Sequence, residues 1–170
     1  MPLSPTQTEI DLRAWILLAT GLPGEQVFYA NQEQGRPEKP YVTLLLATEQ
    51  RQGRDFELTT ATQIPATGRF KQYRSSHREG LLSVQAFGPG SRSALEQLEL
   101  SKTDPDVADL LWRACVTVSH PVGGVRNLTR VLDTEWEERY QLDFIVRWGV
   151  VRERGVDVIE SATLTADVQE

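Results

Sequence analysis

The sequence has few of the residues from which metal sites and nucleophilic active sites are built. Its 170 residues include one cysteine, Cys115, and two histidines, His77 and His120. A single cysteine excludes an internal disulfide, and neither histidine has a cysteine or carboxylate at metal-ligand spacing. We therefore expect surface histidines, no metal and no cofactor. Cys115 follows an apolar helical pattern, which predicts a buried thiol and fits a reducing compartment.

Long apolar runs are missing as well. The longest one near the N-terminus, residues 14–19, is too short to cross a bilayer, and no basic region precedes it. We expect a soluble protein with neither a membrane partner nor a signal peptide. The net charge of −6 argues against broad nucleic-acid binding. The length predicts a single domain over residues 1–170 that can bury its own core.

Positive charge is concentrated in one segment. Residues 51–78 carry six basic and two acidic side chains, a local charge of +4, so the remaining residues sum to −10. Residues 50–67 are polar and have few apolar anchors, which predicts a loop, and over residues 49–80 we expect an extended loop or a hairpin arm. A basic segment on an acidic protein suits a contact between subunits, and a solvated loop explains it equally well.

The clearest periodic pattern lies in residues 137–152. Every second side chain there is large and apolar: Tyr140, Leu142, Phe144, Val146, Trp148 and Val150. This period of two predicts a central strand with one buried face. Residues 128–135 and 156–168 also resemble strands. Because the connections are short, we expect these three strands to pair consecutively as an antiparallel meander.

The remaining pattern mixes helices and strands, which indicates an α+β fold. The first helix is expected to begin at Ser4-Pro5, to end at Gly21, and to pack on the sheet. It is apolar over more than half of its circumference, so a neighbouring subunit is expected to cover part of it. Further helices should begin at Ser91 or Ser93 and at Asp104. Short strands are expected at residues 27–30, 41–47, 81–87 and 116–119.

Two patterns are candidates for sites of chemistry. The acidic residues Asp133, Glu135, Glu137 and Glu138 resemble the ligands of a divalent ion in a nuclease. Solvated strand ends explain them more simply, because no histidine or lysine accompanies them. The turn at residues 88–90, Gly-Pro-Gly, precedes a helix as a phosphate loop does. It lacks the Lys-Ser/Thr pair, and its proline removes a backbone donor, so a plain turn is the better interpretation.

The four tryptophans lie on separate expected elements. They are Trp15, Trp112, Trp136 and Trp148. Three of the four fit core positions of helices or strands, so a platform for stacking nucleic-acid bases has little support. No residue of the sequence is assigned a catalytic role.

Four short motifs follow one another along the chain. They are Arg13-Ala14-Trp15-Ile16, then Arg36-Pro37 with Lys39-Pro40-Tyr41-Val42-Thr43-Leu44, then Ser83-Val84-Gln85-Ala86-Phe87-Gly88, and finally Glu137-Glu138-Arg139-Tyr140-Gln141-Leu142-Asp143-Phe144. In order and spacing the chain resembles the neck and tail terminator proteins, or tail completion proteins, of tailed bacteriophages. The resemblance covers essentially the whole chain. It implies a fold similar to the tail terminator of phage lambda: a mixed, mainly antiparallel sheet with helices packed against it.

The resemblance also implies a structural role in the virion. Such proteins form a ring, usually of six subunits, that caps the tail tube, stops its growth and joins it to the head connector. The expected partners are further copies of the chain, the tail tube protein and the head–tail connector protein, with DNA passing transiently through the lumen. Assembly in the host cytoplasm is expected. The family brings no catalytic residues with it.

Within the basic segment, one cluster is the candidate interface. It consists of Arg69, Phe70, Lys71, Tyr73 and Arg74. Aromatic side chains among cations are typical anchors of protein interfaces. The cluster is expected to meet a neighbouring subunit or the tail tube, with the ring lumen as the alternative location.

Two other classes of function remain open at this point. One is a metal-dependent nucleic-acid enzyme that uses the acidic residues near Asp133. The other is an unrelated intracellular adaptor domain, which would remain a monomer at high concentration.

Overall fold

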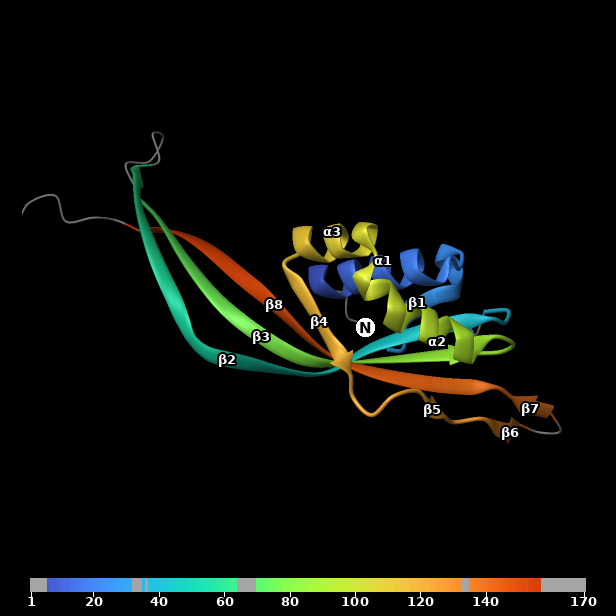
Figure 1. Ribbon diagram of the computed structural model, residues 1–170. Coiled ribbons are helices and arrows are strands. Elements are labelled where there is room, and N and C mark those ends of the chain that lie inside the picture. The colour runs from blue at the N-terminus through green and yellow to red at the C-terminus, as the bar shows by residue number, and fades with distance from the viewer. Residues whose placement is uncertain (1–5, 32–34, 36, 64–69, 133–134, 157–170) are drawn as a thin grey trace, which may run out of the picture. The chain divides into compact units, whose positions relative to one another are not determined.

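A computed structural model describes residues 6–31, 35, 37–63, 70–132 and 135–156 (Figure 1). Side chains are described for these residues except 55–63, 70–72, 132, 135 and 154–156. The chain divides into two compact units. The first comprises Met1–Gln52 and His77–Gly149, and the second comprises Gly53–Ser76 and Val150–Glu170. The single domain expected over residues 1–170 stays a prediction.

The first unit contains the helices and most of the strands. Its helices are α1 (Gln7–Thr20), α2 (Ser91–Leu100) and α3 (Pro105–Arg113), with short 3-10 helices η1 (Gly24–Gln26) and η2 (Ser101–Thr103). Its short strands are β1 (Val27–Tyr29), β4 (Val116–Pro121), β5 (Arg126–Asn127), β6 (Arg130–Leu132) and β7 (Glu135–Glu137). The long strands β2 (Tyr41–Gln63), β3 (Phe70–Phe87) and β8 (Arg139–Val156) continue into the second unit, where they run together as a ribbon.

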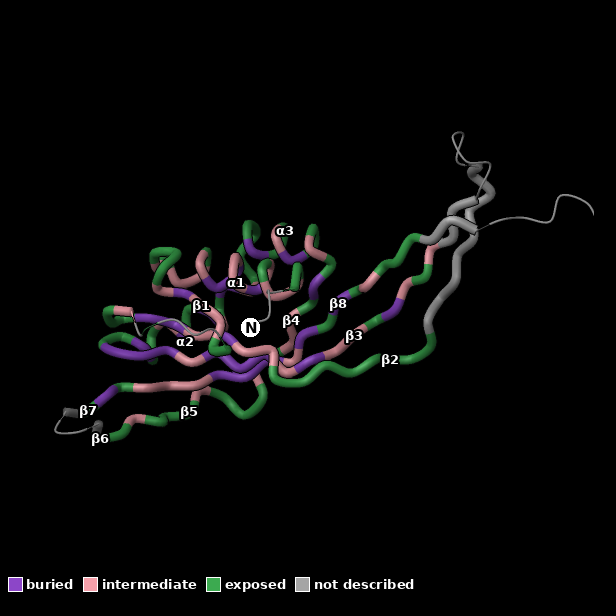
Figure 2. Tube along the Cα trace, turned by 180° about the vertical axis from the view of Figure 1, so that it is seen from behind, coloured by how far each residue is buried: buried purple, intermediate pink, exposed green. Residues whose placement is uncertain are grey.

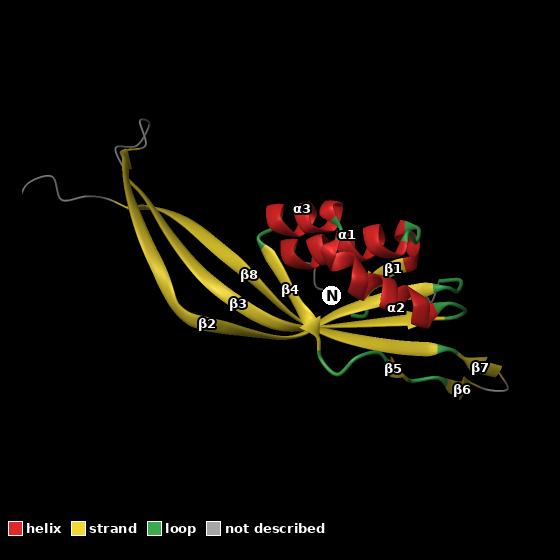
Figure 3. Cartoon of the chain, viewed as in Figure 1, coloured by secondary structure: helices red, strands yellow, loops and turns green. Residues whose placement is uncertain are grey.

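The main sheet has the order β1-β2-β3-β8-β4. Strand β5 also pairs with β8, at Tyr140 and Gln141, whereas β4 pairs with residues 144–148 of β8. Strand β1 is parallel to β2, while β4 and β5 are antiparallel to β8. In the first unit all three helices lie against one face of this sheet (Figure 3). The predicted α+β fold, with a mixed and mainly antiparallel sheet and helices packed against it, is confirmed.

The core lies between the helices and the sheet. Leu142, Phe144 and Val146 of β8 are fully buried, and Trp148 is 6% exposed, which confirms the predicted inward face of this strand. Figure 2 shows the buried residues gathered along the strands that the helices cover. The Trp15 ring of α1 meets the Phe144 ring edge-on, with centroids 5.3 Å apart. The prediction that the first helix packs on the sheet is therefore confirmed.

Helix α1 begins two residues later than expected. Thr6 is its N-cap: the Thr6 hydroxyl accepts a hydrogen bond from the Glu9 amide at 3.3 Å, and the Glu9 carboxylate accepts one from the Thr6 amide at 2.7 Å. This reciprocal pair satisfies two backbone donors at the helix start. Ser4 and Pro5 lie outside the described residues. Gly21 ends the helix with φ of 65°, as predicted.

The predicted meander is wrong. Strand β8 lies between β3 and β4, both of which come earlier in the chain. Strands β3 and β4 therefore take the places beside β8 that residues 128–135 and 156–168 were expected to take. Residues 128–135 do not form one strand, because β6 turns back to pair with β7. The third predicted strand, residues 156–168, lies almost entirely outside the described residues.

Two further predictions fail for local reasons. The loop expected at residues 50–67 is strand β2 as far as Gln63, because backbone pairing with β3 replaces the missing apolar anchors. Of the two alternatives expected for residues 49–80, the described residues therefore form two paired strands, as in a hairpin arm, and not an extended loop. Cys115 is exposed rather than buried. Its φ of 53° turns the chain sharply after α3, so the apolar helical pattern stops before it reaches the thiol.

Candidate assembly surfaces

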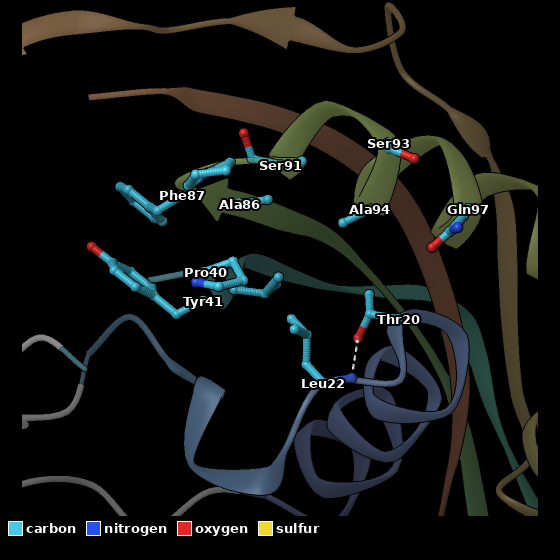
Figure 4. Close-up of a pocket in the computed structure, with 13 residues that line it drawn as sticks. Thr20, Leu22, Pro40, Tyr41, Ala86, Phe87, Ser91, Ser93, Ala94 and Gln97 are labelled. Atoms are coloured by element: carbon cyan, nitrogen blue, oxygen red, sulfur yellow. Dashed lines mark hydrogen bonds between the residues drawn. The ribbon is translucent and has the colours of Figure 1, made fainter. Parts of the chain in front are cut away.

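One end of the first unit carries an apolar hollow. It has a volume of about 210 Å³ and lies between the end of α1 and the start of α2, over the ends of β2 and β3 (Figure 4). Apolar side chains form most of its wall: Leu22, Pro40, Tyr41, Phe87 and Ala94. A cavity of roughly 150 Å³ with apolar walls is large enough to hold a benzene molecule. The hollow can therefore accept one aromatic side chain.

The Gly-Pro-Gly turn at residues 88–90 forms the rim of this hollow. Gly88 and Gly90 have φ of 90° and 79°, a region that favours glycine. A Cβ on Gly88 would lie 2.8 Å from Cβ of Lys39. The turn therefore breaks β3 and starts α2 in tight contact with the segment before β2, and no feature of a phosphate loop is needed to explain it.

A row of stacked rings supports the hollow from the sheet. The Tyr41 ring stacks on Phe87 at 4.5 Å between centroids, and Phe28 lies 5.6 Å from Tyr41 on the other side. The Arg139 guanidinium lies 5.1 Å from the Phe87 centroid. These contacts join β1, β2, β3 and β8, so they fix the aromatic wall of the hollow in place.

Large apolar side chains are exposed on the first unit. Trp112 of α3 is 83% exposed and Trp136 of β7 is 75% exposed, so two of the four tryptophans are buried rather than three. Ile10 and Leu18 of α1 are 45% and 50% exposed, which leaves part of that helix uncovered in the single chain. Exposed groups of this kind mark contacts with other molecules when they cluster.

The sheet face away from the helices carries a polar network. Successive side chains of a strand point to opposite faces, so Gln141 and Asp143 point away from the buried row of β8. The Gln141 amide donates to Ser83 at 2.9 Å and to Asp143 at 2.8 Å. Arg126 of β5 pairs with Asp143, and Arg139 donates to Gln85 at 2.6 Å. The network therefore ties β5, β8 and β3 together through polar contacts.

A second polar cluster surrounds Glu79 of β3. The Arg147 guanidinium donates to one Glu79 oxygen at 2.6 Å, and the amides of Gln50 and Gln52 donate to the other at 3.1 Å each. The hydrogen bond from Arg147 is the main reason that the pKa of the Glu79 carboxyl lies below its ordinary value.

The low pKa of Glu79 gives a testable pH dependence. Because the folded state lowers the pKa, the pair stabilises the protein at neutral pH, and this contribution is lost as the pH falls through the folded-state pKa. We expect Arg147→Ala to raise the Glu79 pKa toward its ordinary value, as measured by carboxyl NMR titration. Arg92→Ala, which removes only the surface pair with Glu96, is the control. An unchanged Glu79 titration in Arg147→Ala would contradict the assignment.

The predicted interface cluster lies at the start of β3, in the second unit. Tyr73 is half-buried and Arg74 is exposed. Arg69 lies outside the described residues, and Phe70 and Lys71 lie in β3 with side chains outside the described set. The role of this cluster in an interface stays a prediction.

The candidate residues for chemistry form no metal-binding group within the part of the chain that the structure describes. His77 and His120 are both exposed. Glu137 is 3% exposed and pairs with Lys39 at 3.0 Å, so the interpretation as a solvated strand end is wrong for this residue. Asp133 and the Glu135 side chain lie outside the described set. Within the described ranges, no group of three or more His, Cys, Asp or Glu side chains is arranged to hold a metal ion.

Sequence reasoning missed both Trp112 and the hollow. Val107 and Leu111 are the buried residues of α3, and at 100° per residue Trp112 points well away from them. The spacing of α3 could therefore have predicted that Trp112 is exposed. No sequence pattern could have predicted the hollow, because the residues of its walls are far apart in the sequence. Among the described residues, no helix has the length and apolar character needed to traverse a membrane.

Comparison with known proteins adds one finding. The model of a family described as phage neck terminator protein matches residues 7–170. A search of curated proteins found no match.

Proposed function

The chain belongs to the phage neck terminator protein family, and from this we propose that it forms a ring at the junction of phage head and tail. Membership makes it a structural component of the phage neck that contacts other head or tail proteins. We further propose that six copies form the ring, that the ring caps the tail tube and stops its growth, and that it joins the tube to the head connector. Assembly takes place in the host cytoplasm, and DNA passes through the lumen.

The family match over residues 7–170 carries this proposal. The exposed apolar side chains of the single chain support it, because Trp112 is 83% exposed and Ile10 and Leu18 of α1 are 45% and 50% exposed, and a neighbouring subunit would remove them from water. An enzyme has less support, because Glu137, one of the acidic residues that favoured one, is buried and paired with Lys39.

The test of the ring uses the purified chain and the phage that encodes it. Native mass spectrometry and electron microscopy should find closed rings of six copies. Phage that lack the gene should make tails of uncontrolled length that do not join heads, and the gene supplied in trans should restore both. A chain that stays monomeric at high concentration, with normal phage yield in its absence, would overturn the proposal.

The basic segment, residues 51–78, is proposed to contact a neighbouring subunit or the tail tube. Its charge of +4 is opposite to that of the remaining chain. Replacing Arg69, Lys71 and Arg74 by glutamate should reduce ring mass or particle yield. Replacing the same three residues by glutamine removes the positive charge without adding negative charge, so it distinguishes the loss of attraction from new repulsion. Normal rings with failed particles would assign the segment to the tube, connector or lumen. Normal rings and normal yield would refute the proposal.

A further inference from the structure

Trp112 is the most exposed of the large apolar side chains described. It lies in the last turn of α3 and is 83% exposed. The buried residues of that helix, Val107 and Leu111, lie on a different side and pack against the core. Tryptophan is enriched among the residues that dominate binding energy at interfaces, and burying one removes roughly 150–250 Å² from water. An indole this exposed is therefore a ready anchor for a second protein surface.

The hollow is the matching feature of the same unit. Its volume of about 210 Å³ and its walls of Leu22, Pro40, Tyr41 and Phe87 suit a large aromatic side chain. Figure 4 shows Gln97 extending from α2 toward the Thr20 and Leu22 side of the hollow. An amide oxygen there is an acceptor for an indole N–H, which can only donate.

Trp112 and the hollow lie at opposite ends of the helical layer. Gln7 and Asp11, at the start of α1, share a surface depression with Leu110 and Arg113 of α3. Thr20, at the end of α1, lines the hollow. A helix of 14 residues separates the two sites by roughly 20 Å. Figure 1 shows α3 ending beside β4, away from the turn where β3 leads into α2. One chain therefore cannot fill its own hollow with its own Trp112.

The first turn of α2 brings the positive end of a helix to the hollow. Ser91, Ser93 and Ala94 of that turn line the hollow, and none of the described side chains caps the backbone amides there. Helix α3 exposes Asp106 and Asp109 near Trp112, and Asp109 pairs with Arg113 at 2.8 Å. A helix N-terminus attracts carboxylates, so the α2 end of the hollow complements Asp106.

We propose that Trp112 of one copy inserts into the hollow beside α2 of the next copy. Two different surfaces then meet at each contact, so the contact is head-to-tail. Repetition of such contacts closes into a ring when the rotation between neighbours is a whole fraction of a turn, as in the proposed ring of six, and gives an open filament otherwise. The inference rests on the proposed ring and assigns the anchor of its subunit interface. Because an interface of standard size buries about 800 Å² on each partner, Trp112 is the centre of a larger contact rather than the whole of it.

The first test compares two exposed tryptophans. Trp112→Ala should weaken association by at least about thirtyfold, the loss typical of an interface hot spot, as measured by sedimentation equilibrium. Trp136→Ala is the matched control and should keep the parent mass. At a dilution at which the parent chain is dissociated, circular dichroism and the thermal midpoint should be unchanged in both variants, because both side chains are exposed in the single chain.

The second test uses complementary variants. Ala94→Phe places a large side chain inside the hollow. If this variant lowers the thermal midpoint, Ser93→Trp replaces it, because Ser93 lines the hollow from an exposed position. At a protein concentration at which Trp112→Ala is monomeric, each hollow variant alone should be monomeric as well. An equimolar mixture of Trp112→Ala with a hollow variant should form a 1:1 dimer and nothing larger, because it contains one intact tryptophan and one intact hollow.

The outcomes distinguish failure of the Trp112 anchor from failure of the ring. A Trp112→Ala chain that forms rings as the parent does overturns this inference and leaves the ring proposal standing. A mixture that stays monomeric, although both variants are folded, also overturns it. A parent chain that never associates overturns the inference and the proposed ring together.

Discussion

Replacing Trp148 by alanine should lower the free energy of unfolding by about 3–5 kcal/mol, the range found for large aromatic side chains removed from a core. Trp148 is 6% exposed and lies opposite Val116 in the β4–β8 pair. The strands around Trp148 are held by backbone hydrogen bonds, so they cannot move inward to fill the cavity that the alanine variant leaves. Urea unfolding of a non-associating variant should measure the loss. Trp136→Ala, at an exposed site, should change stability by less than about 0.5 kcal/mol.

The close packing around Trp148 can be tested from a second position. A Cβ on Gly80 would lie 2.4 Å from the carbonyl oxygen of Thr48 and 3.1 Å from the Trp148 ring. Gly80→Ala must therefore push β2 away from β3 or displace the indole, at a cost of about 1–3 kcal/mol. At Gly149 no described atom lies within 4 Å of the place that a Cβ would take, so alanine should be tolerated much better there. Equal effects at both positions would contradict this packing.

The sequence was most informative where burial is one-sided. In β8, alternate residues are apolar because one face packs under the helices, and the predicted inward row was confirmed down to Trp148. Helix starts at Asp104-Pro105 and the helix end at Gly21 were also predicted, since both depend on local backbone chemistry.

The sequence was least informative where backbone pairing decides the structure. Strands β2 and β3 continue through a mainly polar sequence, and residues 51–54 are exposed, so neither periodicity nor composition indicated a strand from residue 50 to Gln63. The same limit explains the failed meander, because pairing between β3 and β8 joins residues more than 50 positions apart.

Of the two parts of the proposed subunit contact, Trp112 and the hollow, only Trp112 could be predicted from the sequence. The helical period of α3 places Trp112 away from Val107 and Leu111, so its exposure follows from a pattern that can be read without coordinates. The hollow needs the turn after Phe87, the cap of α1 and the start of β2 to converge, and such convergence is a property of the fold. The exposed Cys115 shows the same limit, because one residue with positive φ ended a pattern that otherwise predicted burial.

The attachment of α1 to the core gives the second large effect. Trp15 is fully buried, packs edge-on against Phe144 and donates its indole N–H to the Ser101 hydroxyl at 3.1 Å. Trp15→Ala should therefore cost about 3–5 kcal/mol in urea unfolding. Trp15→Phe keeps a buried ring while it removes the donor, so it should cost clearly less than the alanine variant.

A double-mutant cycle separates the hydrogen bond from the packing. Ser101→Ala leaves the buried indole N–H without its acceptor, which should cost about 1–3 kcal/mol. In the Trp15→Phe background no donor remains to be stranded, and the same serine substitution removes only the bond from its hydroxyl to the Leu98 carbonyl at 2.8 Å. The serine substitution should therefore cost at least about 0.5 kcal/mol less in that background. Equal costs in both backgrounds would mean that Ser101 holds the turn after α2 and contributes nothing to anchoring α1.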